Sequence, residues 1–341
     1  MCDYIGLDVS LEDTHICVVD GVGAVTARAV ARTDPDELAK TISALAPKVK
    51  TVVLETGGQS AWLQQGLAAL GLPAVIVDAR QAKKALSARL NKTDCNDAEG
   101  LAQLARTGWY REVLAKRPAT RRIRAVLMAR ELLVRQRRDL SSQVRGLLRG
   151  FGLAVGRIGH ARFEARVREL AQAEPALLTA LEPLLAVRRV LDRQLDTLTR
   201  QLGAIARDSA DARRLMTVPS VGVMTALGFI TAIDQPHRFV RSADVGAYLG
   251  LTSRRHQSGQ VDWSGRISKQ GDALARALLY EAATVLMTRV KRWTRQKAWA
   301  VRLAGRRGGA KARVALARKL AVTLHRIWVD GTTFNWANEP A

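Results

Sequence analysis

The stretch "DYIGLDVSLEDTHICVVD" (residues 3–20) decides the fold expected for the N-terminal part of the chain. Two short apolar runs, 3–10 and 15–20, flank a polar break, and "VTARAVAR" (25–32) alternates in the same way. Apolar runs of this length joined by a tight turn are typical of a β-hairpin. We therefore expect a hairpin followed by a third strand, with Asp8 near the end of the first strand.

Strand and helix patterns alternate after this hairpin. "DPDELAKTISALA" (34–46) has an acidic start, an early proline and helical apolar spacing, and "SAWLQQGLAALG" (60–71) ends in glycine. The β-branched runs "TVVLE" (51–55) and "AVIVDA" (74–79) are typical of strands. Such alternation predicts an α/β domain with a partly parallel sheet, which we expect over residues 1–112.

Helical patterns dominate from residue 113 to residue 208. One seven-residue repeat and one run stepping by threes and fours are both typical of coiled-coil seams. They consist of Val126, Leu133, Leu140 and Leu147, and of Leu184, Val187, Leu191, Leu195, Leu198, Leu202 and Ile205. We expect these helices to pair with each other or with another copy of the chain. Between them, 153–183 is expected to form shorter helices broken by glycine, Pro175 and Pro183.

Residues 209–330 are expected to form a mainly helical C-terminal domain, followed by a tail over 331–341. "LMTVPSVGVMTALGFITAI" (215–233) has the pattern of a helix, a tight turn and a second helix. The stretch 251–271 is expected to be loop-rich, and further helices follow it. The predicted class is thus α/β plus α.

Charge is distributed unevenly along the chain. The whole protein has a formal charge of +23, yet residues 1–110 hold 11 Lys and Arg against 13 Asp and Glu. Residues 111–341 hold 43 against 18. A basic unit of this kind favours a polyanion, most simply nucleic acid, through phosphate contacts and counterion release.

The sequence also bears on where the protein acts. We find no uncharged apolar stretch of about 18 residues, so no membrane span is expected. "MCDYIGLDVS" lacks the pattern of a signal peptide, and three cysteines without metal-ligand spacing indicate reduced thiols. We therefore expect a cytoplasmic protein.

Four acidic residues have a spacing that suggests a metal site. Asp8 and Glu55 end predicted strands, and strand ends on one edge of a sheet converge on a ligand crevice. Asp94 and Asp97 lie three apart, so both face one side of a helix. Four carboxylates fit hard divalent cations such as Mg²⁺ or Mn²⁺. Two such ions stabilise the attacking and leaving oxygens of a phosphodiester displacement.

Three of the four acids also have an ordinary structural explanation. A lone Asp8 after a strand is a common turn residue, Asp94 is a possible N-cap, and Asp97 suits the first turn of a helix. The ordered set of all four is harder to explain in this way.

A serine lies in a basic stretch of the C-terminal part. "SRRHQSGQ" (253–260) places Ser258 before a glycine, and Ser264 and Ser268 are rivals by composition alone. Cations beside a serine can hold a scissile phosphate and offset transition-state charge. The candidate phosphate-binding residues are Arg254, Arg255, Arg266 and Lys269. The structural alternative is a Ser-Gly turn in a phosphate-binding loop.

Two further features have both a nucleic-acid interpretation and a structural one. "VPSVG" (218–222) is similar to a helix-hairpin-helix turn, although Ser220 stands where its first glycine is usual. Trp263, Trp293 and Trp299 are candidates for stacking on bases, but we expect core positions for them.

These residues together resemble a known family. The hairpin-first topology carrying Asp8 resembles the RNase H-like, RuvC-type nuclease fold. Nearly the whole chain resembles the DEDD transposases of the IS110 family of insertion sequences. The motifs that carry this resemblance are "YIGLDVS", "LETGG", "NKTDCNDAEGLAQL", "VPSVGVMTALGFITAI", "RFVRSADVGAYLGLTSRR", "QSG" and "GRISKQG".

The resemblance implies an activity and partners. It implies a RuvC-like domain with Asp8, Glu55, Asp94 and Asp97, a coiled coil, and a C-terminal domain whose catalytic serine falls on Ser258. Family members are guided by a structured non-coding RNA that pairs with donor and target DNA. They act as homo-oligomers, expected here to be a dimer or tetramer, in which the acidic site of one subunit completes the serine site of another. The expected location is the bacterial cytoplasm, in association with the nucleoid.

We therefore expect a transposase that cleaves and rejoins DNA through a phosphoserine intermediate with Mg²⁺ or Mn²⁺. One alternative is a RuvC-like, metal-dependent, structure-specific endonuclease in which water attacks and no covalent intermediate forms. Another is a nucleic-acid-binding protein without catalytic activity.

Overall fold

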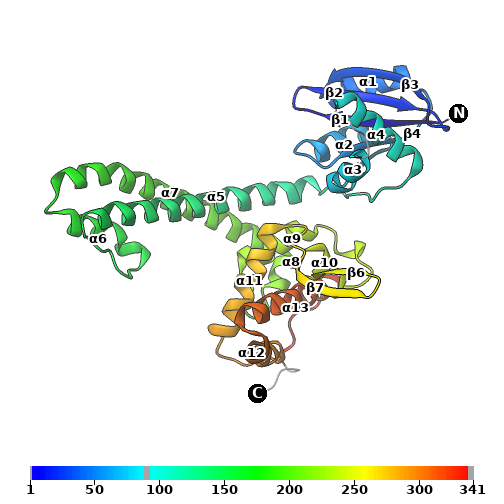
Figure 1. Cartoon of the computed structure of the whole chain (residues 1–341). Helices are drawn as coiled ribbons and strands as arrows, with labels where there is room; N and C mark the ends of the chain where they lie inside the picture. Colours follow the sequence, from blue (N-terminus) through cyan, green and yellow to red (C-terminus); the bar gives the residue numbers. More distant parts are fainter. Residues whose placement is uncertain (1, 88–92, 337–341) are drawn as a thin grey trace. The chain divides into compact units, whose positions relative to one another are not determined.

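The computed structural model describes residues 2–87 and 93–336 (Figure 1). The chain divides into two compact units, residues 1–117 and 118–341, and each has its own hydrophobic core. The predicted boundary near residue 208 therefore lies inside the second unit. Of the predicted tail, residues 337–341 lie outside the described part.

The first unit is a five-stranded sheet with helices, as the α/β prediction requires. Its strand order is β3-β2-β1-β4-β5, with antiparallel pairing among β1, β2 and β3 and parallel pairing of β1 with β4 and of β4 with β5. Its elements are β1 (Asp3–Val9), β2 (Asp13–Val19), β3 (Val25–Arg32), α1 (Pro35–Leu45), β4 (Val49–Glu55), α2 (Ser60–Ala69), β5 (Ala74–Val77), α3 (Ala79–Leu86) and α4 (Asp94–Thr107).

The short helix α3 was not expected from the sequence. The strand predicted over 74–79 ends at Val77, because the Asp78 carboxylate accepts a hydrogen bond from the backbone N–H of Arg80 and caps the new helix. An aspartate at an N-cap satisfies one of the orphan N–H groups at a helix start.

Different helices cover the two faces of the sheet. Ile5 and Leu7 of β1 share a core with α1 and α2, whereas Tyr4 packs with residues of α4. Side chains alternate between faces along a strand, so Gly6 also faces α4. A Cβ at Gly6 would lie 2.0 Å from the carbonyl oxygen of Ala98, so the backbone of α4 rests directly on β1.

The second unit is mainly helical. Its elements are α5 (Pro118–Gly150), η1 (His160–Arg162), α6 (Phe163–Ala171), α7 (Pro175–Asp208), α8 (Ala210–Leu215), α9 (Val223–Ile233), η2 (Pro236–Arg238), α10 (Asp244–Tyr248), β6 (Ser253–Ser258), β7 (Val261–Ile267), α11 (Ala273–Thr288), α12 (Arg295–Arg307) and α13 (Gly309–Asp330).

Two sequence-based expectations for this unit are wrong. The stretch 251–271 is not a loop, since β6 and β7 pair as an antiparallel hairpin within it. Both strands are mostly exposed, and so they lack the apolar alternation that marks a half-buried strand. Pro183 does not break a helix but lies inside α7. Packing against a neighbouring helix therefore outweighs the local cost of the proline.

The two long helices α5 and α7 pack against each other in antiparallel orientation (Figure 1). Arg130 bonds to Thr199, Arg137 to Asp192, and Arg188 to Ser141, so contacts descend one helix as they climb the other. The buried residues of α5 include Leu127 and Leu148, one position beyond the predicted heptad. The helices thus pair within the chain, while a supercoiled geometry stays a prediction.

A polar layer interrupts this apolar seam. Asp192 lies 3.3 Å from Arg137, 2.9 Å from His160 and 3.4 Å from Arg188. Arg188 is buried, and it also donates to the hydroxyl of Ser141. Burial lowers the pKa of His160 more than the Asp192 carboxylate raises it, and Arg137 and Arg188 lower it further. A buried arginine whose donors meet partners of fixed position specifies one register of the helix pair.

We expect Asp192→Ala to destabilise the second unit by about 3 kcal/mol, because a buried Arg188 would lose its counter-charge. Urea denaturation followed by circular dichroism measures this change. Asp139→Ala is the matched control, since the exposed Asp139 pairs with the exposed Arg138 and should alter stability by less than about 0.5 kcal/mol. Equal effects of the two substitutions would contradict a structural role for the layer.

We expect Gly6→Ala to destabilise the first unit by about 2 kcal/mol, because the added methyl group would force α4 away from β1. In differential scanning calorimetry of the whole chain, the unfolding transition of the first unit should shift to a lower temperature while that of the second unit stays unchanged. Gly57→Ala is the control, because a Cβ there meets nothing within 4 Å. An unchanged transition in Gly6→Ala would show that the contact between α4 and β1 is looser than described.

Candidate functional site

The sheet register brings Asp8 and Glu55 to the same edge. β1 and β4 are parallel with Leu7 opposite Leu54, so Asp8 and Glu55 follow at the same level at the carboxyl ends of the two strands. Both are half-buried. Gly6 and Val53, two residues earlier in each strand, face α4, so alternation directs both carboxylates toward α4 as well.

The start of α4 contributes the other two acids. Thr93 is the N-cap, and its hydroxyl accepts a hydrogen bond from the backbone N–H of Asn96 at 3.2 Å. The N-cap interpretation of Asp94 is therefore wrong, because Asp94 is the first residue of the helix proper. Asp97 is half-buried one turn later, directly before Ala98, which touches the backbone of Gly6. Residues 91 and 92 of the same motif lie outside the described residues.

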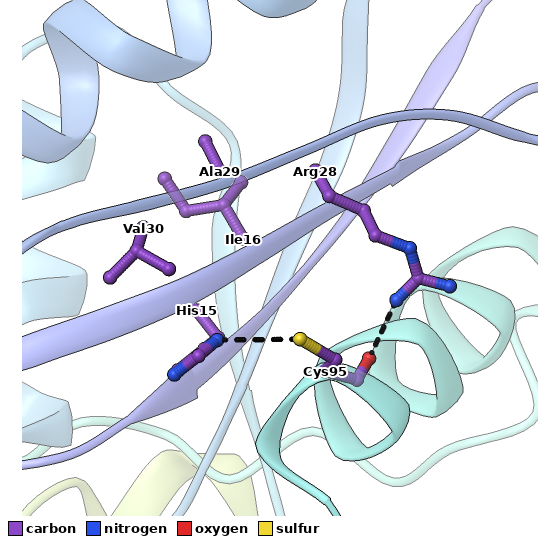
Figure 2. A pocket seen from close by; sticks show the side chains of 6 residues that line it. All are labelled: His15, Ile16, Arg28, Ala29, Val30 and Cys95. Atoms are coloured by element: carbon purple, nitrogen blue, oxygen red, sulfur yellow. Dashed lines mark hydrogen bonds between the residues drawn. The ribbon is translucent and has the colours of Figure 1, made fainter.

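His15 lies next to both Asp8 of β1 and Asp94 of α4, and the sequence analysis did not identify it. His15 lies opposite Asp8 in the β1–β2 hairpin, and its Nε2 lies 3.7 Å from a carboxylate oxygen of Asp94. Figure 2 shows the imidazole turned toward Cys95, whose Sγ lies 3.7 Å from Nδ1. The predicted strand bounds, 3–10 and 15–20, would place Cys17 opposite Asp8, so only the observed register, with β2 starting at Asp13, reveals His15 there.

Arg28 of β3 holds the first turn of α4 from the neighbouring strand. Its guanidinium donates to the carbonyl oxygen of Cys95 at 3.1 Å (Figure 2). It also forms an ion pair with Glu99. A cavity of about 190 Å³ opens beside these contacts. It is lined by His15, Ile16, Arg28, Ala29, Val30 and Cys95.

The four carboxylates have the donor chemistry of a hard divalent cation, which prefers oxygen ligands. In residues 2–87 and 93–336, however, no three Asp, Glu, His or Cys side chains come close enough to hold one ion. The fold therefore directs the acids to one edge of the sheet without forming a closed coordination set.

A fifth carboxylate at this edge is already neutralised. Asp78 follows β5, whose Val77 lies opposite Glu55. Burial alone would raise the pKa of Asp78, but hydrogen bonds from Arg80 and its positive charge hold that pKa below the ordinary value. Asp78 therefore has a capping role and is a weaker candidate for metal binding than the other four acids.

Ser258 lies at the tip of the β6–β7 hairpin in the second unit. It is exposed and pairs with Val261 across a two-residue loop whose first residue, Gly259, has φ +55°. A positive φ at that position is typical of the tight turns that join hairpin strands. Ser264 lies within β7, and Ser268 follows β7 with its backbone bonded to Thr252. Of the three serines, Ser258 alone lies at the tip.

The four predicted phosphate-binding residues all belong to this hairpin or its base. Arg255 makes two hydrogen bonds to Asp262, at 2.9 and 2.6 Å, and they lower the pKa of that carboxyl. Arg254 donates to the carbonyl oxygen of Ser268 at 3.0 Å. Arg266 and Lys269 are exposed, and Lys269 has the strained φ of +54°.

The other candidates for nucleic-acid contact are the turn at Ser220 and three tryptophans, and their positions differ. Ser220, in the turn between α8 and α9, has φ +72°, a conformation that glycine adopts at no steric cost. The expectation of a core position is wrong for Trp263 and Trp293, which are 55% and 47% exposed. Trp299 does pack against the core.

None of the described helices is both long enough and apolar enough to cross a membrane.

Comparisons with known proteins match both units of the chain, and the first match continues past the end of the first unit into α5. Residues 5–152 match the DEDD transposase family of IS110 elements, and residues 212–299 match the transposase IS116/IS110/IS902 family. The DEDD match suggests an RNase H-like fold for the first unit and implies a divalent metal cofactor.

Individual relatives are also transposases by name. The transposase for insertion sequence element IS1111A of Coxiella burnetii is 32% identical over 330 residues, which cover 93% of this chain and 87% of the relative. A probable family 20 transposase of Pseudomonas aeruginosa is 32% identical over 237 residues, which cover 68% and 70%. The transposase for insertion sequence element IS1328 of Yersinia enterocolitica is 29% identical over 247 residues, which cover 72% and 74%.

These matches span both the acidic edge and the serine hairpin, and transposases are enzymes that cleave and rejoin DNA. The chain therefore belongs to the IS110 family of insertion-sequence transposases.

Proposed function

We propose that this transposase cleaves and rejoins DNA with two parts, the acidic edge of the first unit and Ser258 of the second. The observation that carries the proposal is the register of the sheet. It aligns Asp8 with Glu55 at one edge of the sheet, and α4, which carries Asp94 and Asp97, packs on the same two strands. This unit has a near-neutral charge, although the whole chain is strongly basic.

Asp8, Glu55, Asp94 and Asp97 would hold the divalent metal, with Mg²⁺ or Mn²⁺ as the expected ion. When bound there, the metal would neutralise the acids and stabilise charge on the oxygens of the scissile phosphate. Arg28 and His15 would keep the first turn of α4 on the sheet, so that Asp94 and Asp97 remain near the strand ends.

Ser258 would be the nucleophile. Its exposed place at a tight turn supports this role, because an attacking hydroxyl must reach a phosphate in DNA. The serine oxygen would form a bond to phosphorus while the bond to the leaving deoxyribose oxygen breaks, and the serine proton would leave to a base or to water. The number of phosphoester bonds is unchanged, so rejoining needs no nucleotide cofactor.

The basic second unit would bind nucleic acid backbones. Its charge supports contacts with both donor and target DNA and with a structured guide RNA. Arg254, Arg255, Arg266 and Lys269 would serve the hairpin's own DNA contact. We further propose a dimer or tetramer in which the acidic edge of one subunit meets Ser258 of another.

A metal-dependent endonuclease activity is the second candidate. One observation favours it. All four proposed acids belong to the first unit, within the DEDD match, whereas Ser258 belongs to the second unit. In that reaction, water attacks the phosphate, and the products have free ends and no bond to protein.

We expect Ser258→Ala to abolish covalent protein–DNA adducts while DNA binding persists. Denaturing gels of labelled DNA carrying the ends of the insertion element would detect the adducts. Ser264→Ala is the matched control, because Ser264 is exposed in the same hairpin but lies away from its tip. Adducts that survive in Ser258→Ala would exclude Ser258 as nucleophile, and cleavage without any adduct in the unmodified protein would favour the endonuclease.

We expect Asp97→Asn to lower DNA cleavage by at least about 100-fold, because a charged ligand for the metal would be lost. A second readout is the rise in melting temperature on adding Mg²⁺ or Mn²⁺, which should shrink in the variant because ligand binding stabilises the folded state. Asp36→Asn is the control, since Asp36 lies in the first turn of α1. Equal metal-dependent stabilisation of both variants would remove Asp97 from the metal site.

A further inference from the structure

Trp263 is an exposed aromatic residue in the strand opposite Ser258. Its indole ring lies nearly parallel to the imidazole of His256, with 5.8 Å between ring centroids and 15° between planes. The two residues are directly paired across β6 and β7. Trp263 is 55% exposed, so this pair of rings is a surface feature and not part of a core.

A glycine provides space for the ring. A Cβ at Gly265 would lie 2.8 Å from the Cζ3 atom of Trp263, so a larger residue at position 265 would displace the indole. The ring thus lies along its own strand, between His256 on one side and the bare backbone of Gly265.

The rings and Ser258 share one face of the hairpin. From 255 to 258 the pairing is regular, with Ser258 opposite Val261 and His256 opposite Trp263. Residues two apart point to the same side of a strand, so these four side chains lie together. The other face carries the ion pair of Arg255 and Asp262.

We propose that His256 and Trp263 form a stacking platform for a nucleobase next to the phosphate that Ser258 attacks. The proposal rests on the proposed function in that Ser258 marks this phosphate. Aromatic rings beside basic groups are the usual means of holding unpaired bases, and each stacked base contributes about 1–3 kcal/mol. The platform would therefore hold an unpaired base without reading its identity.

A nucleobase fits this surface better than a second copy of the chain does. The exposed apolar groups on this face are a single indole and Val261, whereas a stable protein interface buries on the order of 1,000 Å². Exposed Arg266 and Lys269, at the base of the same hairpin, complement a phosphate backbone. The family's established partner is DNA.

The test uses the full-length Ser258→Ala protein, purified with any RNA it retains, and DNA carrying the element's ends. 2-Aminopurine replaces single bases at successive positions around the cleavage site. We expect its fluorescence to be quenched at one or two positions beside the cleaved phosphate. Trp263→Leu should abolish this quenching and weaken binding roughly 5- to 100-fold, whereas Trp263→Phe should retain most of both.

Two further variants control for misfolding and for non-specific stacking. Gly265→Ala keeps the indole but displaces it, so it should reduce quenching while leaving the circular dichroism spectrum unchanged. Trp109→Leu removes an indole that is 74% exposed in the first unit and should leave the quenching unchanged.

Quenching that persists in Trp263→Leu, or that occurs at no position, would overturn the proposal. A changed oligomeric state of Trp263→Leu in light scattering, with quenching intact, would make this face a protein interface instead. Quenching and binding are measured on a protein that already lacks the Ser258 hydroxyl, so they do not depend on which residue is the nucleophile. A failed nucleophile assignment would therefore appear separately, as adducts that survive in Ser258→Ala.

Discussion

The contact between α4 and β1 is the constraint on which the acidic edge depends. A helix normally packs on a sheet through a layer of side chains, but Gly6 removes that layer and leaves the backbone of α4 against the strand. Helix position is then fixed closely by backbone atoms. Because Ala98 makes this contact, Asp97 lies one residue away from it, on the helix that packs over Gly6 and Asp8 near the end of β1. A larger residue at position 6 would move both aspartates of α4 away from the sheet.

In the second unit, two helices of 33 and 34 residues must be held in one alignment along their length. An uninterrupted apolar seam would allow them to slide by a turn or a heptad. The layer around Arg188 and Asp192 opposes sliding, because any other register would bury a charge without its partners. At the base of α5, the hydroxyl of Thr120 bonds to the buried Asp234 at the end of α9. The long helices are thereby joined to the helical core that carries the serine hairpin.

That hairpin has little packing along its length and firm attachment at its base. A Cβ at Gly250 would lie 2.1 Å from the carbonyl oxygen of Gln270, so the segments before β6 and after β7 touch through their backbones. The exposed strands lie beyond this junction. Because the strands are exposed, they have few buried contacts to stabilise them. Under the proposed function, DNA would cover them during the reaction. His256, Ser258 and Trp263 would then be partly buried in the complex.

Sequence by itself determined the elements whose signals are local. The alternation in 3–32, the β-branched run that ends in Glu55, and the presence of a strand after 74 and of a helix carrying Asp94 and Asp97 all follow from local propensity. The end of β5 at Val77 and the cap at Thr93 did not. The motifs also singled out four acids and Ser258 as the candidate site residues. Tertiary structure decided the rest, because it depends on which residues face one another. Strand register joined His15 to Asp8, the bare Gly6 set the place of α4, and partner helices carried α7 through Pro183. The hairpin at Ser258 consists of polar, exposed residues, so its sequence has no alternating hydrophobic pattern. Cross-strand pairing and backbone contacts at its base define these two strands instead.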